Sequence, residues 1–344
     1  MAITSLFVRR STAALAIAGT AWLATPCLAQ QAGAQQASAQ QAGAQQAYPS
    51  RAVRLIVPFA PGGTSDVFAR LVSDKLSQRL GQQFFVENIP GASGNIGTGQ
   101  AAKAAADGHT VFIAFSSFII NPSLFASVPY DPLKDFEPVM LGVSGTHVIT
   151  VTPSVPAKSM TELLALIRAN PAKYNFAHGG AGTPGHLLGE QLRISQKLDI
   201  VPVPFNGAGP AVASVIGGHT PIGITALAPA NPQIAAGQLR AIAVTSKARA
   251  SLLPDVPTTV EAGFPDLVGD LWVGVMVPAK TPAEIVTKLN QELAAVLAMP
   301  DTRERLAAVG FDTIAGSPQA FRDQLATELG FWRKVVQDAK VKVQ

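Results

Sequence analysis

Two glycine-rich segments hold the residue types best suited to binding an anion through the backbone. In the first, Gly62 and Gly63 let the main chain come close to a ligand, and Thr64 and Ser65 follow with hydroxyl donors. A helix is expected to begin here, and the N–H groups of a first helical turn are unpaired and carry a partial positive charge. A carboxylate can bind there, although these residues could instead only turn the chain. Asp66 would repel an anion, so we expect it to cap the helix.

The second segment, residues 178–185, repeats the order of strand end, glycines and helix start. It also matches the G-x-G-x-x-G pattern of dinucleotide-binding loops at Gly180, Gly182 and Gly185. In those proteins an acidic residue closes the following strand, whereas Asp199 opens the strand expected here. The segment therefore favours a second anion-gripping loop over a nucleotide site, and we expect no cofactor.

Sequence patterns of catalysis and metal binding are absent. The chain contains no G-x-S-x-G nucleophile turn and no H-E-x-x-H zinc motif. His178 and His186 lie eight positions apart across a glycine loop, which is a weak spacing for metal ligands. We therefore predict neither catalysis nor a metal site. An exported hydrolase is the alternative, because the residues of a catalytic triad need not be close in sequence.

These loops must be positioned by alternating strands and helices. Strands are predicted at residues 53–59, 84–89 and 110–115, and helices at 66–80 and 95–106. Such alternation is typical of an α/β fold with largely parallel sheets. Two further helices are predicted near the C-terminus. Thr281 and Ser317 are expected to be their N-caps, each followed by a proline at the first helical position.

The middle of the chain echoes its beginning. Residues 176–180 repeat the pattern of residues 59–63, and residues 218–220 repeat that of residues 108–110. A glycine near position 207 likewise corresponds to one near position 91. The constant order of these echoes predicts two similar α/β lobes, although convergent turn chemistry could produce the same matches.

The N-terminus has the pattern of a signal peptide over residues 1–29. Arg9 and Arg10 precede an apolar stretch too short to span a bilayer, and Cys27-Leu28-Ala29 places small residues at a cleavage site. Twin-arginine export and lipidation of Cys27 are alternatives. Residues 30–47 form a repetitive Gln, Ala and Gly tract that cannot build a core, so we interpret them as a linker. The expected location is the periplasm.

Charge argues against a nucleic-acid partner. The chain has 26 Lys and Arg residues against 22 Asp and Glu residues, with no basic run or stripe.

An ordered set of motifs then resembles one family. The motifs are Pro58 to Gly63 with Asp66, Ala69 and Arg70; Pro90 to Gly97; Asp107 to Thr110; Asn121 to Phe125; Pro129 to Pro132; Asp135 to Val139; Gly180 to Leu187; Val203 to Gly207; Val256 to Thr258 with Glu261 to Gly263; and Trp272 to Gly274 before Pro278 to Pro282. Together they resemble the Bug family, the periplasmic solute-binding proteins of tripartite tricarboxylate transporters.

The resemblance implies a type II periplasmic binding protein, a Venus-flytrap clamp of two lobes that closes on a carboxylate, often with ordered water. We expect lobe 1 to comprise residues 48–146 plus 268–344 and lobe 2 residues 147–267, with hinges near Thr146 and Val268. Many family members have Lys where Asn206 stands and Asp near Pro221, so the identity of the ligand does not transfer. The loss of that acid also argues against an amino-acid ligand.

The expected function is binding of a small organic carboxylate, such as a dicarboxylate or aromatic acid, and its delivery to the integral membrane permease. The protein is expected to be a monomer. The predicted ligand-binding residues come from the glycine loops, the end of the third strand and the corresponding segments of lobe 2: Phe59, Ala60, Pro61, Gly62, Gly63, Thr64, Ser65, Ser116, Ser117, His178, Gly179, Gly180, Ala181, Thr183, Asn206, Gly207, Ala208 and Thr225.

Overall fold

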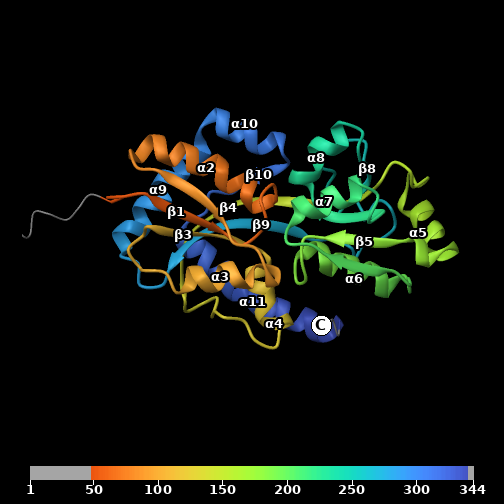
Figure 1. The fold of residues 1–344 in the computed structure, drawn as a ribbon, viewed down its shortest axis with the longest axis horizontal. Coiled ribbons are helices and arrows are strands. Elements are labelled where there is room, and N and C mark those ends of the chain that lie inside the picture. Colours follow the sequence, from red (N-terminus) through yellow and green to blue (C-terminus); the bar gives the residue numbers. More distant parts are fainter. Residues whose placement is uncertain (1–47, 340–344) are drawn as a thin grey trace, which may run out of the picture. The chain divides into compact units, whose positions relative to one another are not determined.

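The computed structural model describes residues 48–339 (Figure 1). The predicted signal peptide and linker lie outside these residues. Within the described part of the chain, no helix is long and apolar enough to cross a membrane.

A β-sheet with parallel and antiparallel strands runs through the molecule and divides it into two halves. Half 1 contains strands β1 (Val53–Val57), β2 (Phe84–Asn88), β3 (Thr110–Phe115), β9 (Asp270–Pro278) and β10 (Phe311–Thr313), and helices α2 (Thr64–Leu80), α3 (Asn95–Ala102), α4 (Ser117–Leu124), α9 (Ala283–Ala298), α10 (Pro300–Ala308) and α11 (Pro318–Ala339). Half 2 contains strands β5 (Asn175–His178), β6 (Val201–Pro204), β7 (Ile222–Ala226) and β8 (Arg240–Val244), and helices α5 (Met160–Ala169), α6 (Pro184–Ser195), α7 (Ala208–Ile216) and α8 (Leu227–Ala235). Strand β4 (Phe136–Val151) runs through both.

The two halves repeat one topology. The strand order across the sheet is β2-β1-β3-β9 in half 1 and, in the opposite direction, β6-β5-β7-β4 in half 2. In each half the first three strands are parallel and the fourth is antiparallel to them. A helix follows each parallel strand, as the echoes in the sequence predict. The predicted α/β fold is therefore confirmed, and each antiparallel pair among the described strands includes β4 or β9.

Alternation along the strands builds a core on each face of the sheet. In β1, Leu55 packs with Phe68 of α2, whereas Ile56 points to the other face and packs with Phe118 of α4. Figure 1 shows α2, α9 and α10 over one face of half 1 and α3, α4 and α11 over the other. The helices are thus held by burial of their apolar stripes, and those that follow a parallel strand, such as α2 after β1, begin near the carboxyl end of that strand.

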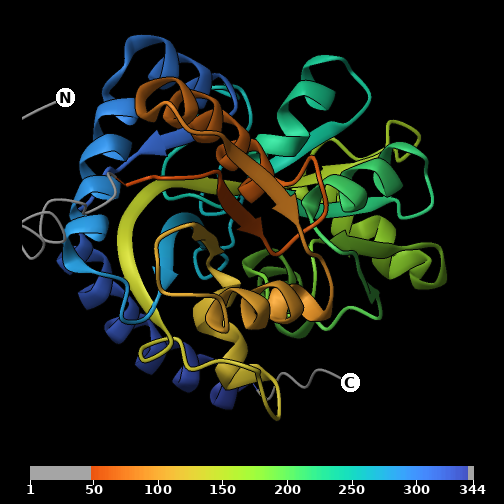
Figure 2. The same ribbon diagram turned by 60° about the vertical axis from the view of Figure 1, so that its left-hand side comes forward.

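Strand β4 joins the halves. It pairs with β9 as far as Thr146 and with β7 from His147 onward. Figure 2 shows it as a long, strongly curved ribbon. A second crossing lies beside the first, because Gly269 donates to Thr245 of half 2 while Asp270 pairs with Thr146. The lobe boundaries given above, and any hinge motion at these crossings, stay predictions.

Element boundaries differ from the predicted ones for local reasons. Strand β1 ends at Val57, because Pro58 has no N–H to continue the ladder. Helix α3 ends at Ala102, four residues earlier than expected. Ser317 Oγ accepts from Ala320 N, as the predicted N-cap of α11 should. Thr281 is not the N-cap of α9, because that helix begins at Ala283, after Pro282. The Thr281 hydroxyl instead donates to the Pro278 carbonyl.

Candidate functional site

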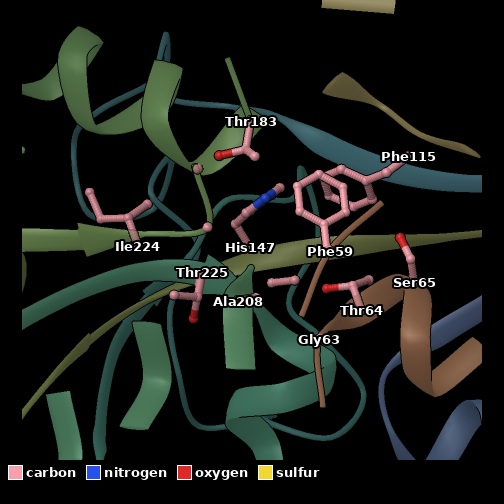
Figure 3. Close-up of a pocket in the computed structure, with 13 residues that line it drawn as sticks. Phe59, Gly63, Thr64, Ser65, Phe115, His147, Thr183, Ala208, Ile224 and Thr225 are labelled. Carbon is pink, nitrogen blue, oxygen red and sulfur yellow. The ribbon is translucent and has the colours of Figure 1, made fainter. Parts of the chain in front are cut away.

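A narrow central cavity lies between the halves (Figure 3). Half 1 lines it with Phe59, Gly63, Thr64, Ser65 and Phe115, and half 2 with His147, Gly179, Thr183, Gly185, Ala208, Ile224, Thr225 and Ala226. About 30 Å³ is free for the centres of water-sized molecules. That is room for roughly two waters, so a larger ligand requires the cavity to widen.

Three helices begin at the central cavity. Thr64 and Ser65 form the first turn of α2, Thr183 and Gly185 flank the start of α6, and Ala208 is the first residue of α7. No side chain caps the N–H groups of α2 or α7, whereas at α6 Pro184 has no N–H and Thr183 Oγ1 accepts from His186 N. The helix starts and their partial positive charges favour an anion without any charged side chain.

The described residues that line the cavity include no Lys, Arg, Asp or Glu, and His147 is the one titratable side chain among them. Phe59 and Phe115 form an edge-to-face pair with ring centres 5.6 Å apart, and Ile224 and Ala226 add further apolar surface. The cavity can therefore surround an apolar body and offer neutral donors to an acidic group.

Four buried polar atoms around this space have no hydrogen-bond partner among the described residues: Thr64 Oγ1, Ser65 Oγ, His147 Nδ1 and Thr225 Oγ1. Nearly all buried polar groups in proteins are paired, and an unpaired one costs about 1–3 kcal/mol. Four of them around one cavity indicate that a bound molecule or water completes the hydrogen bonds.

The loop before α2 is held in place by Asp66. Its carboxylate accepts from Gly62 N at 2.9 Å, Arg70 Nε at 2.9 Å and Asn88 Nδ2 at 2.9 Å. Asn88 also donates to the Phe59 carbonyl. Burial raises the pKa of Asp66, but the hydrogen bonds from Arg70, Gly62 and Asn88 outweigh it, so the net pKa lies below its usual value. Asp66 therefore shapes the loop, and the expectation that it caps the helix is wrong, because no side chain caps the start of α2.

Loops of the two halves touch beside the cavity. Ala60 N donates to the Asn206 carbonyl at 2.8 Å, and a Cβ added to Gly207 would lie 3.3 Å from Ala60 N. A Cβ on Gly182 would lie 2.5 Å from Asn121 Oδ1 of α4. The two halves are thus in direct contact beside the cavity, where glycines permit their close approach.

Eight of the predicted ligand-binding residues line the central cavity: Phe59, Gly63, Thr64, Ser65, Gly179, Thr183, Ala208 and Thr225. His178, Gly180, Ala181 and Asn206 instead line a neighbouring, more open cavity. The remaining ones lie in the loops around the site or at the start of α4: Ala60, Pro61, Gly62, Ser116, Ser117 and Gly207. The Ser116 hydroxyl is already engaged, since it accepts from Trp272 N at 2.8 Å.

Five lining residues were not predicted. Phe115, Ile224 and Ala226 are direct neighbours in sequence of predicted residues, so the strand ends could have indicated them. Gly185 belongs to the predicted second loop. His147 lies on the antiparallel strand β4, far from either glycine loop in sequence, and no local motif marks it.

His178 and His186 support the second loop. Their rings lie tilted against each other with centres 4.5 Å apart, and His186 Nδ1 accepts from Gly182 N. Burial lowers the pKa of His178 to about 3 and also lowers that of His186, so both are neutral at pH 7. In the described residues, no group of three or more His, Cys, Asp and Glu side chains is placed to hold a metal ion.

Comparison with known proteins gives relatives that match most of the chain. The model of the tripartite tricarboxylate transporter family receptor, TctC, matches residues 68–341. The protein BugT of Bordetella pertussis is 35% identical over 299 residues, covering 86% of this chain and 92% of BugT. A UPF0065 protein encoded between tcbD and tcbE in Pseudomonas sp. strain P51 is 36% identical over 290 residues, covering 84% of this chain and 86% of that protein.

Solved structures agree in fold. The periplasmic binding protein BugD superposes with a TM-score of 0.83 at 32% identity, covering 86% of this chain and 100% of BugD. Rpa4515 of R. palustris, solved with adipate, has a TM-score of 0.82 at 35% identity and covers 86% of this chain and 99% of its own. MatC of Rhodopseudomonas palustris, solved with bound malate, has a TM-score of 0.80 at 31% identity and covers 84% of this chain and 100% of its own. The Bug proteins BugT and BugD are thus relatives of this chain, and it has the two-lobed fold of periplasmic binding proteins. The chain therefore belongs to the TctC family of tripartite tricarboxylate transporter receptors.

Proposed function

We propose that this protein binds a small organic carboxylate in the periplasm and delivers it to the membrane permease of a tripartite tricarboxylate transporter. The observation that carries the proposal is the set of unpaired hydroxyl and imidazole atoms at the central cavity, beside three helix starts and without a charged side chain. Neutral donors and helix N-termini suit a carboxylate, and they suit an ammonium group poorly.

The relatives support a small acid as the ligand. Two structural neighbours above 30% identity were solved with adipate and malate, which are both dicarboxylates. The mixed lining of two phenylalanines, small apolar side chains and hydroxyls accommodates a short carbon skeleton with acidic ends. We infer that the ligand belongs to this class, and that the protein works as a monomer that binds without turnover.

A thermal-shift screen of organic acids tests the function. An acid at about 100 times its dissociation constant should add roughly 2.7 kcal/mol to the free energy of unfolding. The melting temperature should then rise by about 5 °C, whereas the matching amide or ester should leave it unchanged. Equal stabilisation by the neutral analogue would contradict the proposal that the ligand binds as an anion. Recovery of the acid unchanged after incubation separates binding from the alternative of an exported hydrolase.

A further inference from the structure

His147 differs from every other residue at the central cavity, because it alone could acquire a positive charge there. Its side chain is 2% exposed, and its Nδ1 has no partner among the described residues. Figure 3 shows it among the lining residues, with Thr183 on one side and Phe59 and Phe115 on another. A buried imidazole with an unpaired nitrogen at a cavity is placed to bind whatever enters.

The backbone of His147 is held firmly. Its N–H donates to Thr245 Oγ1 at 3.2 Å, and its carbonyl accepts from Thr245 N at 3.0 Å. His147 pairs with Ala226 of the neighbouring strand β7. Its ring lies against the start of α6, because a Cβ added to Gly185 would be 3.3 Å from Cδ2 of His147. The backbone of His147 is therefore fixed by β7 and Thr245, and the start of α6 bounds its ring on one side.

The elements around His147 bring no charge to the cavity. The start of α6 contributes His186, which is neutral and accepts from Gly182, and Glu190, which is paired with Arg193. Near β8 and β9, Lys247 is exposed, and Asp270 lines a separate cavity with Asp312. The strand β7 contributes Thr225 and no titratable group. An anion in the central cavity would therefore have no counter-charge except one placed on His147.

In the free protein His147 is neutral at pH 7. Burial lowers its pKa to about 4, with a smaller opposing effect from the backbone of Gly269. A negative charge within hydrogen-bond reach raises the pKa of an imidazole, because it stabilises the protonated form. Ligand binding and proton binding at this ring must then favour each other, since their coupling is reciprocal.

We propose that the carboxylate binds together with one proton, which is taken from solvent onto His147, so that Nδ1–H of the imidazolium donates to the ligand. An N–H bond forms at Nδ1 as the proton leaves its donor in the solvent or buffer, no bond of the ligand changes, and the site gains the ligand charge and the proton charge together. This inference rests on the proposed function, and it makes His147 the residue that neutralises the ligand in a cavity otherwise without formal charge.

The sign of the pH dependence follows from the two states. The pKa of His147 is higher in the complex than in the free protein, so affinity rises as pH falls through the pKa of the complex. It rises by at most tenfold per pH unit and becomes constant below the pKa of the free protein, near 4. A site with only neutral donors that binds the fully ionised acid would show no such rise in this range.

Isothermal titration calorimetry tests the inference. Malate, adipate and the acid with the largest thermal shift are titrated at pH 6 into the whole protein, in buffers that differ in heat of ionisation. The slope of binding heat against buffer heat gives the protons taken up per ligand, and we expect net uptake of up to one proton. In His147→Gln, which keeps a polar side chain, the uptake should disappear and the affinity at pH 6 should fall at least tenfold. The control His219→Gln changes an exposed histidine and should keep both.

The outcomes separate the inference from the function. Binding by the wild-type protein with no proton uptake overturns the inference and leaves the function standing, and this result does not depend on a variant folding. Uptake that persists in His147→Gln also overturns it, because the proton then goes elsewhere. If no acid in the screen binds, the proposed function and the inference both fall. NMR titration of the His147 ring, with a higher pKa in the complex, would locate the proton directly.

Discussion

Glycine at the central cavity acts by leaving space. Gly63 has φ −85° and ψ 175°, an extended conformation open to any residue, so glycine is not required there by the backbone. A Cβ at this position would lie 3.7 Å from Ala208 N, across the cavity at the start of α7. The absence of a side chain therefore keeps two helix starts, one from each half, accessible to the same ligand.

Gly63→Val should weaken ligand binding at least tenfold, about 1.4 kcal/mol. The branched side chain would fill the space between α2 and α7, while the permitted backbone angles leave folding intact. Titration calorimetry with an acid found in the screen measures the loss, and circular dichroism checks the fold. Gly180→Val is a less clean test, since its φ of 129° adds backbone strain to any loss of space. Unchanged affinity in Gly63→Val would place the ligand away from α2.

At the scale of elements, the strand β1, its loop and helix α2 form one unit that presents Thr64 and Ser65. Buried Asp66 holds the unit together, because its carboxylate accepts hydrogen bonds from the loop, the helix and β2. The hydroxyls thus owe their position to an acid that does not line the cavity.

Asp66→Asn should lower the free energy of unfolding by about 1–3 kcal/mol at pH 7, because charge-assisted hydrogen bonds to Gly62 and Arg70 are lost. The folded-state pKa of Asp66 is lowered, so its contribution is present above the unfolded pKa, near 4, and is lost as pH falls through the folded pKa. The difference between wild type and variant in urea unfolding should therefore shrink as pH falls below about 4.

Asp74→Asn is the matched control, since Asp74 is exposed on the same helix. We expect it to change stability by less than about 0.5 kcal/mol at either pH. An Asp66 variant as stable as this control would show that the hydrogen bonds do not hold the loop.

At the scale of the whole molecule, both halves line the central cavity, so we expect a ligand there to contact both. Contacts between the loops are made by backbone and glycine, which permit separation as readily as approach. A ligand gripped from both halves favours the closed state through contacts that the open state cannot make. Because the cavity is narrow, we expect the halves to separate when a ligand enters.

X-ray scattering of the chain from Tyr48 should therefore show a smaller radius of gyration with a bound acid than without it. Gly182→Ala should resist this change and bind more weakly, because its Cβ would lie 2.5 Å from Asn121 Oδ1 and 2.9 Å from Leu124 Cδ2 in the other half. Gly237→Ala is matched in backbone strain, with φ 70° against 77°, but has nothing within 4 Å, so it should close like wild type. Identical scattering with and without a bound acid would indicate a cavity closed from the start.

The sequence by itself determined the features that depend on near neighbours in the chain. The order of strand, glycines and helix start sufficed to predict β1 with α2 and β5 with α6, and to select Thr64, Ser65 and Thr183. The repeated echoes predicted two halves of one topology, because each half is built from local strand–helix units.

Only the tertiary structure decided which polar atoms are left for a ligand. Ser116 and Ser65 are both serines at strand-to-helix turns, yet Ser116 Oγ is taken by Trp272 N of β9, whereas Ser65 Oγ remains unpaired. His147 enters the site from β4, where the chain crosses between the halves. A hydrogen-bond partner supplied by a strand 156 residues away cannot be read from local pattern, since it depends on how the whole sheet assembles.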